Sequence, residues 1–186
     1  GNRAAASDWV CEEVVVPDDF ATLAGLAETV EFLAARNVSF RIDPVLEPIG
    51  FGFAASLERY MTVRRRFPQA EMMMGIGNLT ELTDVDSAGL NVMLAGFCQE
   101  LGVRSVLTTE VINWCRTSVR EFDRARRLVF HAIRERVLPK KLEPDLVMLR
   151  DPKLIAEFRR LARDTRTAAK LLAMRLRVLI EEKTHP

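Results

Sequence analysis

Four short apolar segments recur along the chain, and helical patterns occupy the intervals between them. The segments are residues 13–16, 40–43, 71–75 and 105–109, whose centres near residues 15, 42, 73 and 107 lie 27, 31 and 34 residues apart. This spacing is typical of a strand followed by a helix. The segments are mostly apolar and do not alternate with polar residues, which indicates parallel strands buried on both faces.

Apolar residues at spacings of three and four predict a helix after each strand. The helices are expected from the acidic pair Asp18-Asp19 to Leu33, from Ser56 to the residues before Pro68, from Asp84 to Leu101, and from Arg116 to Val137. Gly102 is expected to end the third helix. The chain is therefore predicted to have an α/β fold made of four consecutive βα units.

The charge changes after Leu138. Residues 139–186 hold 12 Lys and Arg against 7 Asp and Glu, a net charge of +5, whereas the remainder holds 15 against 19, a net charge of −4. An apolar stripe at helical spacing over residues 154–179 predicts a helical extension. Two domains are expected, residues 1–138 with the βα units and residues 139–186 as a basic helical extension. A solvated flank is favoured over a phosphate-binding or lipid-binding surface for its basic face.

Composition excludes several classes of protein. The formal net charge of +1 does not suggest a nucleic-acid-binding protein. No apolar run approaches the roughly 20 residues that span a membrane, so a cytoplasmic protein without a membrane partner is expected. Cys11, Cys98 and Cys115 form no CxxC motif, and only two His accompany them. No metal site is therefore predicted, and the thiols are expected to be buried as small apolar groups.

Polar side chains follow the second and third strands where each strand ends. Asp43 can accept two N–H bonds from an aminopyrimidine-like ring, and Asn78 offers a donor and an acceptor that suit a ring nitrogen beside a carbonyl. The carboxyl ends of parallel strands hold the ligand in βα folds, so we expect a flat heteroaromatic ligand here. Two alternatives stay open, a capping or turn role for Asp43 and a positive φ for Asn78. Glu47 and Glu110 are weaker candidates for acid–base groups.

The same strand ends resemble a known family. Asp43-Pro44, followed after a short insertion by Gly50-Phe51-Gly52-Phe53, resembles the DPGFGF segment of dihydropteroate synthases. Residues 75–80 (Gly-Ile-Gly-Asn-Leu-Thr) are similar to the next strand end of the wider pterin-binding superfamily. The phrases GIGNLTELTDVDSAG and VLTTEV resemble the dihydropteroate synthase-related proteins of organisms that use tetrahydromethanopterin. The resemblance covers about residues 1–150.

The resemblance implies a fold and a site. A TIM (β/α)8 barrel needs roughly 250 residues, so a chain with four such strands is expected to be the C-terminal half of one. The implied pterin-binding residues are Asp43, Asn78, Gly50, Phe51 and Gly52, the glycines letting the backbone approach the ring. The open sheet of a half-barrel is expected to be covered by a second copy of the chain, by a missing N-terminal half-barrel, or by the helices of residues 151–186.

The resemblance also implies a reaction. Family members are expected to condense a hydroxymethyl-dihydropterin pyrophosphate with an aryl amine in folate or tetrahydromethanopterin biosynthesis, with Mg²⁺ bound through the pyrophosphate. Leu79 stands where synthases carry a Lys, and residues 108–110 (Thr-Thr-Glu) replace an Arg-x-His, so a non-catalytic pterin-binding fragment is an alternative. The setting of Asn78 suggests a second alternative, that the chain is a component of a pterin-linked methyltransferase. Arg116 and Arg120 are candidate anion-binding residues, unless they pair with carboxylates along their helix.

Overall fold

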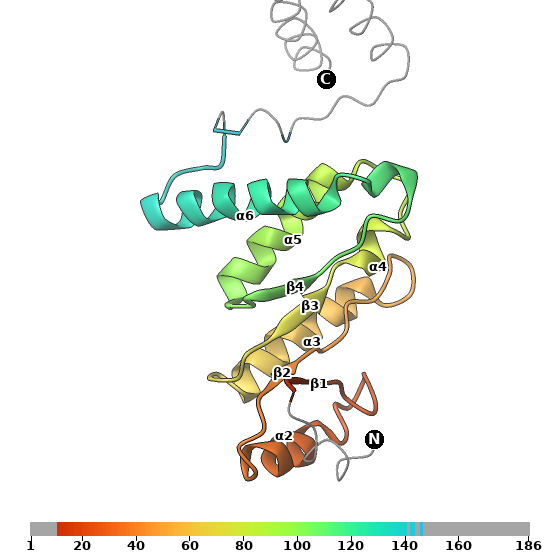
Figure 1. Ribbon diagram of the computed structural model, residues 1–186, viewed down its shortest axis with the longest axis vertical. Helices are drawn as coiled ribbons and strands as arrows, with labels where there is room; N and C mark the ends of the chain where they lie inside the picture. The colour runs from red at the N-terminus through yellow and green to blue at the C-terminus, as the bar shows by residue number, and fades with distance from the viewer. Residues whose placement is uncertain (1–10, 141, 144–145, 147–186) are drawn as a thin grey trace, which may run out of the picture. The chain divides into compact units, whose positions relative to one another are not determined.

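The computed structural model describes residues 11–140, 142–143 and 146 (Figure 1). The chain divides into two compact units, Gly1–Leu146 and Val147–Pro186, and every described residue belongs to the first. The predicted helical extension therefore lies outside the described residues, apart from its first few positions. The expected domain boundary near residue 138 stays a prediction.

In the described part of the chain, four short parallel strands lie at the centre: β1 (Glu13–Val15), β2 (Phe40–Ile42), β3 (Met73–Gly75) and β4 (Ser105–Leu107). β1 pairs with β2 and β3 pairs with β4. An isolated bridge between Ile42 and Met72 joins the two pairs, and the Ile42 N–H donates to the Glu71 carbonyl at 2.9 Å. The strands thus follow one another in chain order, as predicted, although each is one or two residues shorter than its apolar segment.

Helices follow every strand. They are α2 (Leu26–Ala34), α3 (Phe53–Arg66), the short α4 (Gly77–Thr80), α5 (Ser87–Leu101) and α6 (Ser118–Glu135), with a 3-10 turn, η1 (Asn113–Cys115), before α6. The predicted α/β class with parallel strands is confirmed. Gly102, with a φ of 76°, ends α5 as expected. None of the described helices has the length and apolar character needed to cross a membrane.

The first helix begins at Leu26, later than the pattern predicts. Asp19 accepts hydrogen bonds from the N–H and the hydroxyl of Thr22 at 2.7 and 2.6 Å, which hold these residues in a turn. Gly25 follows with a φ of 73°, and the Asp18 carboxylate fills the space where its side chain would lie. The predicted helix start was wrong because these acidic side chains stabilise a turn in competition with the helix.

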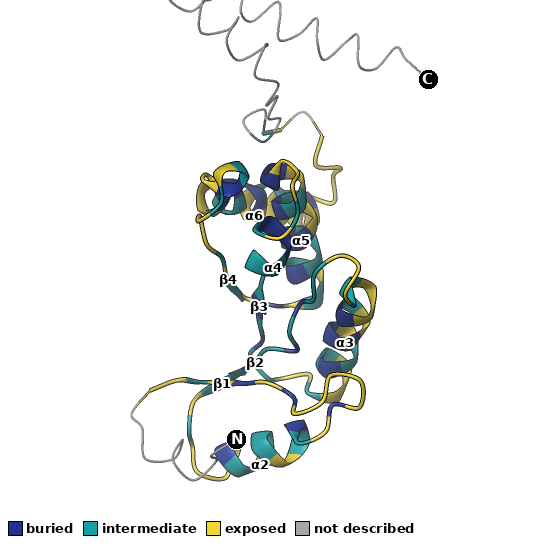
Figure 2. Ribbon diagram, turned by 90° about the vertical axis from the view of Figure 1, so that its right-hand side faces the viewer, coloured by how far each residue is buried: buried dark blue, intermediate teal, exposed yellow. Residues whose placement is uncertain are grey.

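A hydrophobic core lies between one face of the strands and helices α2, α3 and α5. Its buried side chains include Val15, Leu26, Leu33, Ile42, Tyr60, Val63, Met72, Met74, Leu94 and Cys98. The buried residues of α3 lie on its side towards the strands (Figure 2). The thiols of Cys98 and Cys115 are buried as predicted, whereas Cys11 is exposed.

The opposite face of the strands is open in the described part of the chain. Val14 is 50% exposed, Val16 43% and Leu107 59%. Each lies next to a strand position that faces the helices. Because neighbouring side chains of a strand point to opposite faces, these three residues lie on the face away from the helices. The prediction that the strands are buried on both faces was wrong for these residues, since no described element covers them.

Candidate functional site at the carboxyl ends of the strands

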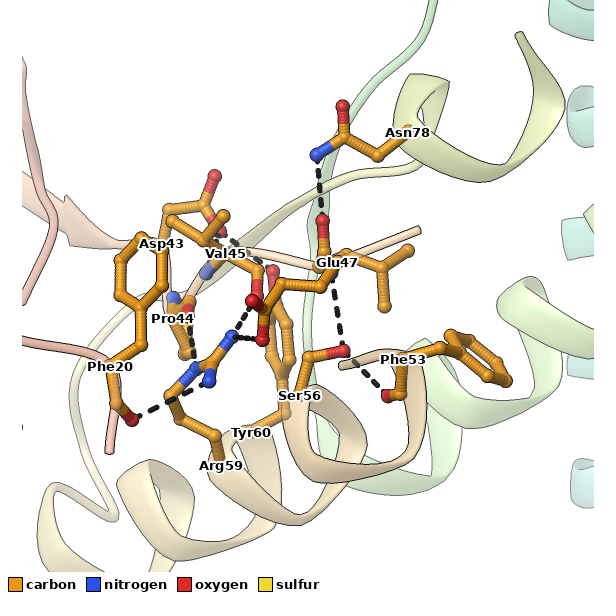
Figure 3. Close-up of polar contacts among 11 residues, drawn as sticks. Phe20, Asp43, Pro44, Val45, Glu47, Phe53, Ser56, Arg59, Tyr60 and Asn78 are labelled. Carbon is orange, nitrogen blue, oxygen red and sulfur yellow. Dashed lines mark hydrogen bonds and ion pairs between the residues drawn. The ribbon is translucent and has the colours of Figure 1, made fainter. Parts of the chain in front are cut away.

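Asp43 directly follows β2, and two neighbours bind one of its oxygens (Figure 3). Oδ1 accepts hydrogen bonds from the Tyr60 hydroxyl at 2.7 Å and from the Val45 N–H at 2.8 Å. The turn expected as an alternative at Asp43 is therefore present. Oδ2 accepts no hydrogen bond from the described residues, and it lies 4.0 Å from the place where a Cβ on Gly75 would stand. Asp43 thus directs a free oxygen towards the end of β3.

Tyr60 is held in place as a hydrogen-bond donor to Oδ1. Its side chain is fully buried on α3, and the Phe97 ring packs edge-on against it with the centroids 6.3 Å apart. Burial, together with the negative charge of Asp43, raises the pKa of Tyr60 far above its ordinary value. The hydroxyl therefore stays protonated at neutral pH and donates to Oδ1. Since Oδ1 already has two donors, a ligand would meet Oδ2.

Arg59 organises the loop between β2 and α3. The side chain is 7% exposed, and its guanidinium donates to the carbonyl oxygens of Pro44 at 2.6 Å and Val45 at 2.7 Å. It also forms an ion pair with Glu47 at 2.9 Å and lies over the Phe20 ring, 4.8 Å from its centroid. A buried cation that satisfies several acceptors of one loop fixes the path of that loop. Glu47, considered above as an acid–base group, serves as the counter-ion in this arrangement.

Val45 carries backbone strain in the same loop. Its φ is 68°, a left-handed conformation that β-branched residues rarely adopt. Its N–H is bound to Asp43 and its carbonyl to Arg59, so the surroundings hold it there. Such strain costs roughly 1–3 kcal/mol and is concentrated at functional sites. The strained residue therefore points to this loop as a binding element.

The glycines of the DPGFGF-like segment shape the loop. Gly50 and Gly52 have positive φ values of 84° and 116°. A Cβ on Gly52 would lie 2.7 Å from the Glu47 carboxylate, so this glycine makes room for the counter-ion of Arg59. Phe51 is 79% exposed. The direct contact of Gly50, Phe51 and Gly52 with a ligand stays a prediction.

An open pocket of about 270 Å³ lies at the ends of β3 and β4. It is lined by Gly75, Gly77, Asn78, Glu81 and Leu82 on the β3 side and by residues 107–109 on the β4 side. A Cβ on Gly77 would lie 3.3 Å from the Thr109 hydroxyl oxygen, so this glycine lets the two segments approach closely. Oδ2 of Asp43 lies beside Gly75, although Asp43 itself does not line the pocket.

Asn78 connects the pocket to the loop after β2. Its side-chain amide donates to the Leu46 carbonyl at 2.6 Å (Figure 3). It lies in α4 and has no positive φ, so that alternative was wrong. The amide oxygen and the second amide N–H take no partner among the described residues. Asn78 thus lines the pocket, and Asp43, at the neighbouring strand end, lies beside the lining residue Gly75.

Glu81 fixes the segment after β4. Its carboxylate accepts hydrogen bonds from the Thr109 hydroxyl at 2.6 Å and from the N–H groups of Val111 and Ile112 at 2.9 Å each. The bond from Thr109 contributes most to lowering the pKa of Glu81 to about 2. One wall of the pocket therefore carries a fixed negative charge.

Sequence reasoning missed both Arg59 and Glu81. Arg59 could have been noticed as a charged residue on the buried stripe of its helix, between Ser56 and Val63. No comparable local signal marks Glu81, because its donors follow it by 28 residues or more.

The candidate anion-binding residues lie elsewhere. Arg116 and Arg120 are exposed and do not line the pocket. Neither forms an ion pair with a described residue, so their expected alternative, pairing along the helix, is not found. Glu110 accepts the Val119 N–H at 2.9 Å and thereby caps the start of α6. Over the described residues, no group of three or more His, Cys, Asp and Glu gathers as metal ligands would.

Comparison with known proteins gives a relative of greater length. No protein-family model matches the chain. The chain is 32% identical over 158 residues to an uncharacterized protein of Methanocaldococcus jannaschii, a match that covers 78% of this chain and 30% of that protein. The chain therefore spans less than a third of the length of this relative.

Proposed function

We propose that this chain binds a pterin at the carboxyl ends of β2, β3 and β4. The observation that carries the proposal is the free oxygen of Asp43, which lies beside Gly75, a residue that lines the same pocket as Asn78. A flat ring can lie against Gly75, which has no side chain of its own to fill the space. Its N–H edge then meets Oδ2 of Asp43, and its carbonyl edge meets the amide of Asn78. The resemblance of both strand ends to pterin-binding proteins supports the same ligand.

The proposed architecture is the C-terminal half of a (β/α)8 barrel. Parallel strands in chain order, with helices packed on one face, are the arrangement of such a barrel. The open face that bears Val14 and Leu107 would be the filled interior of the closed barrel. The greater length of the archaeal relative is consistent with further strands in a longer protein.

Isothermal titration with 6-hydroxymethylpterin tests the proposal. Asp43→Asn keeps the shape of the side chain and removes the charge that attracts the N–H edge. A hydrogen bond to a charged group contributes about 1.5–3 kcal/mol, so the affinity should fall at least about tenfold. Glu58→Gln, an exposed charge removal on α3, is the matched control and should bind like the parent chain. A parent chain that gives no binding up to about 1 mM pterin would refute the proposal.

Pterin recognition is common to the three functions that the resemblance implies. Of these, binding without condensation is favoured by one observation, the lack of any Lys or Arg among the residues that line the pocket. Condensation needs cations near the departing pyrophosphate. Incubation with hydroxymethyl-dihydropterin pyrophosphate and an aryl amine separates the two, since only a synthase forms the coupled product. The methyltransferase role stays a prediction.

A further inference from the structure

The segments that follow the strands are strongly acidic. Residues 16–25, 43–52, 76–86 and 108–117 together hold eight Asp and Glu but a single basic residue, Arg116. The carboxyl ends of parallel strands lie along one edge of a sheet, so these charges surround the same edge. Charges of one sign around a cleft repel ligands of that sign.

The buried cation near the pocket is already satisfied. Arg59 forms an ion pair with Glu47, which neutralises it. Four of the N–H donor directions of its guanidinium are taken by Pro44, Val45, Phe20 and Glu47. The ion pair of Arg59 with Glu47 therefore has no net charge, and only one of the five N–H donors of the guanidinium is left for an anionic group.

The pocket itself offers neutral and negative groups. Glu81 is held as a carboxylate by three hydrogen bonds, and Oδ2 of Asp43 lies beside the lining residue Gly75. The other lining groups are glycine backbone, leucine side chains, an amide and two threonines. A phosphate placed here would meet the Glu81 carboxylate, and no Lys or Arg among the lining residues would compensate for it.

We infer that the pocket takes a pterin whose side chain carries no phosphate and that it discriminates against the pyrophosphate ester. The inference rests on the proposed pterin-binding function and narrows its ligand to a neutral or cationic pterin.

Two titrations of the same chain test the inference. The dissociation constants for 6-hydroxymethylpterin and for its pyrophosphate ester are measured at about 10 mM ionic strength, with and without Mg²⁺. The ester should bind at least about tenfold more weakly, and the gap should narrow at about 0.5 M salt because screening weakens the repulsion. An ester that binds as tightly as the alcohol at about 10 mM ionic strength, with or without Mg²⁺, overturns the inference and leaves pterin binding intact. Binding of neither ligand refutes pterin binding, and the inference falls with it.

A pair of variants tests whether the discrimination is local. Leu82 lines the pocket and is 64% exposed, and Met93 on α5 is 70% exposed but lies outside the pocket lining. Leu82→Lys should tighten binding of the ester several-fold relative to that of the alcohol. Met93→Lys, with the same change in net charge, should alter neither. An unchanged ester affinity in Leu82→Lys, or an equal gain in both variants, would contradict a local electrostatic origin.

Discussion

Replacing Arg59 with Met removes the cation that holds the β2–α3 loop while keeping an unbranched side chain in α3. The carbonyls of Pro44 and Val45 then lose their donor, and Glu47 loses its ion-pair partner. Breaking a buried ion pair by removing one partner costs about 3–5 kcal/mol. The Glu47 side chain is 24% exposed and can be partly hydrated in the variant. We therefore expect the lower end of that range, a loss of about 3 kcal/mol in the free energy of unfolding.

Urea unfolding followed by circular dichroism measures this loss. The pair of Arg41 with Glu12 provides the control, since its atoms are 2.8 Å apart but its side chains are 33% and 42% exposed. Arg41→Met should cost less than about 1 kcal/mol, as is usual for ion pairs at the surface. Equal losses in Arg59→Met and Arg41→Met would refute the conclusion that burial makes Arg59 the organiser of the loop. So would a loss below about 1 kcal/mol in Arg59→Met.

Three further changes test other parts of the structure. Because the pKa of Glu81 is lowered, its contribution to stability is present above a pH of about 4.5 and is lost as the pH falls through about 2. Glu81→Gln should therefore lower the melting temperature at pH 7. The difference in melting temperature between variant and parent should close near pH 2. A difference that does not change with pH would contradict this assignment. Asn91 is fully buried and donates to the Glu121 carboxylate at 3.1 Å. Asn91→Ala should therefore lower the free energy of unfolding, measured in urea, by about 2–3 kcal/mol. A loss under about 0.5 kcal/mol would show that the contact is unimportant. If the open strand face pairs with a second copy of the chain, Leu107→Glu should abolish the concentration-dependent dimerisation seen in light scattering. The control Met93→Glu should leave dimerisation intact. A dimer that survives Leu107→Glu must use another surface.

Much of the fold could be predicted because hydrophobic periodicity is local. A four- or five-residue apolar segment followed by a helical stripe indicates a βα unit without knowledge of its neighbours. Asp43 and Asn78 could be chosen in the same way, because a polar residue directly after a strand must lie at the carboxyl edge of the sheet. The prediction failed near Asp18, where hydrogen bonds between side chain and backbone outweigh helical periodicity.

The sequence by itself determined the order of strands and helices and the edge of the sheet at which the candidate site lies. Only the tertiary structure decided which groups remain free there. One oxygen of Asp43 is occupied by Tyr60, 17 residues later, and Arg59 is neutralised by Glu47, 12 residues earlier. Glu81 is held by donors from beyond β4. The strand-end residues are brought together only when the strands pair, so the occupied and free hydrogen-bonding groups of the pocket are set by packing and not by any local pattern.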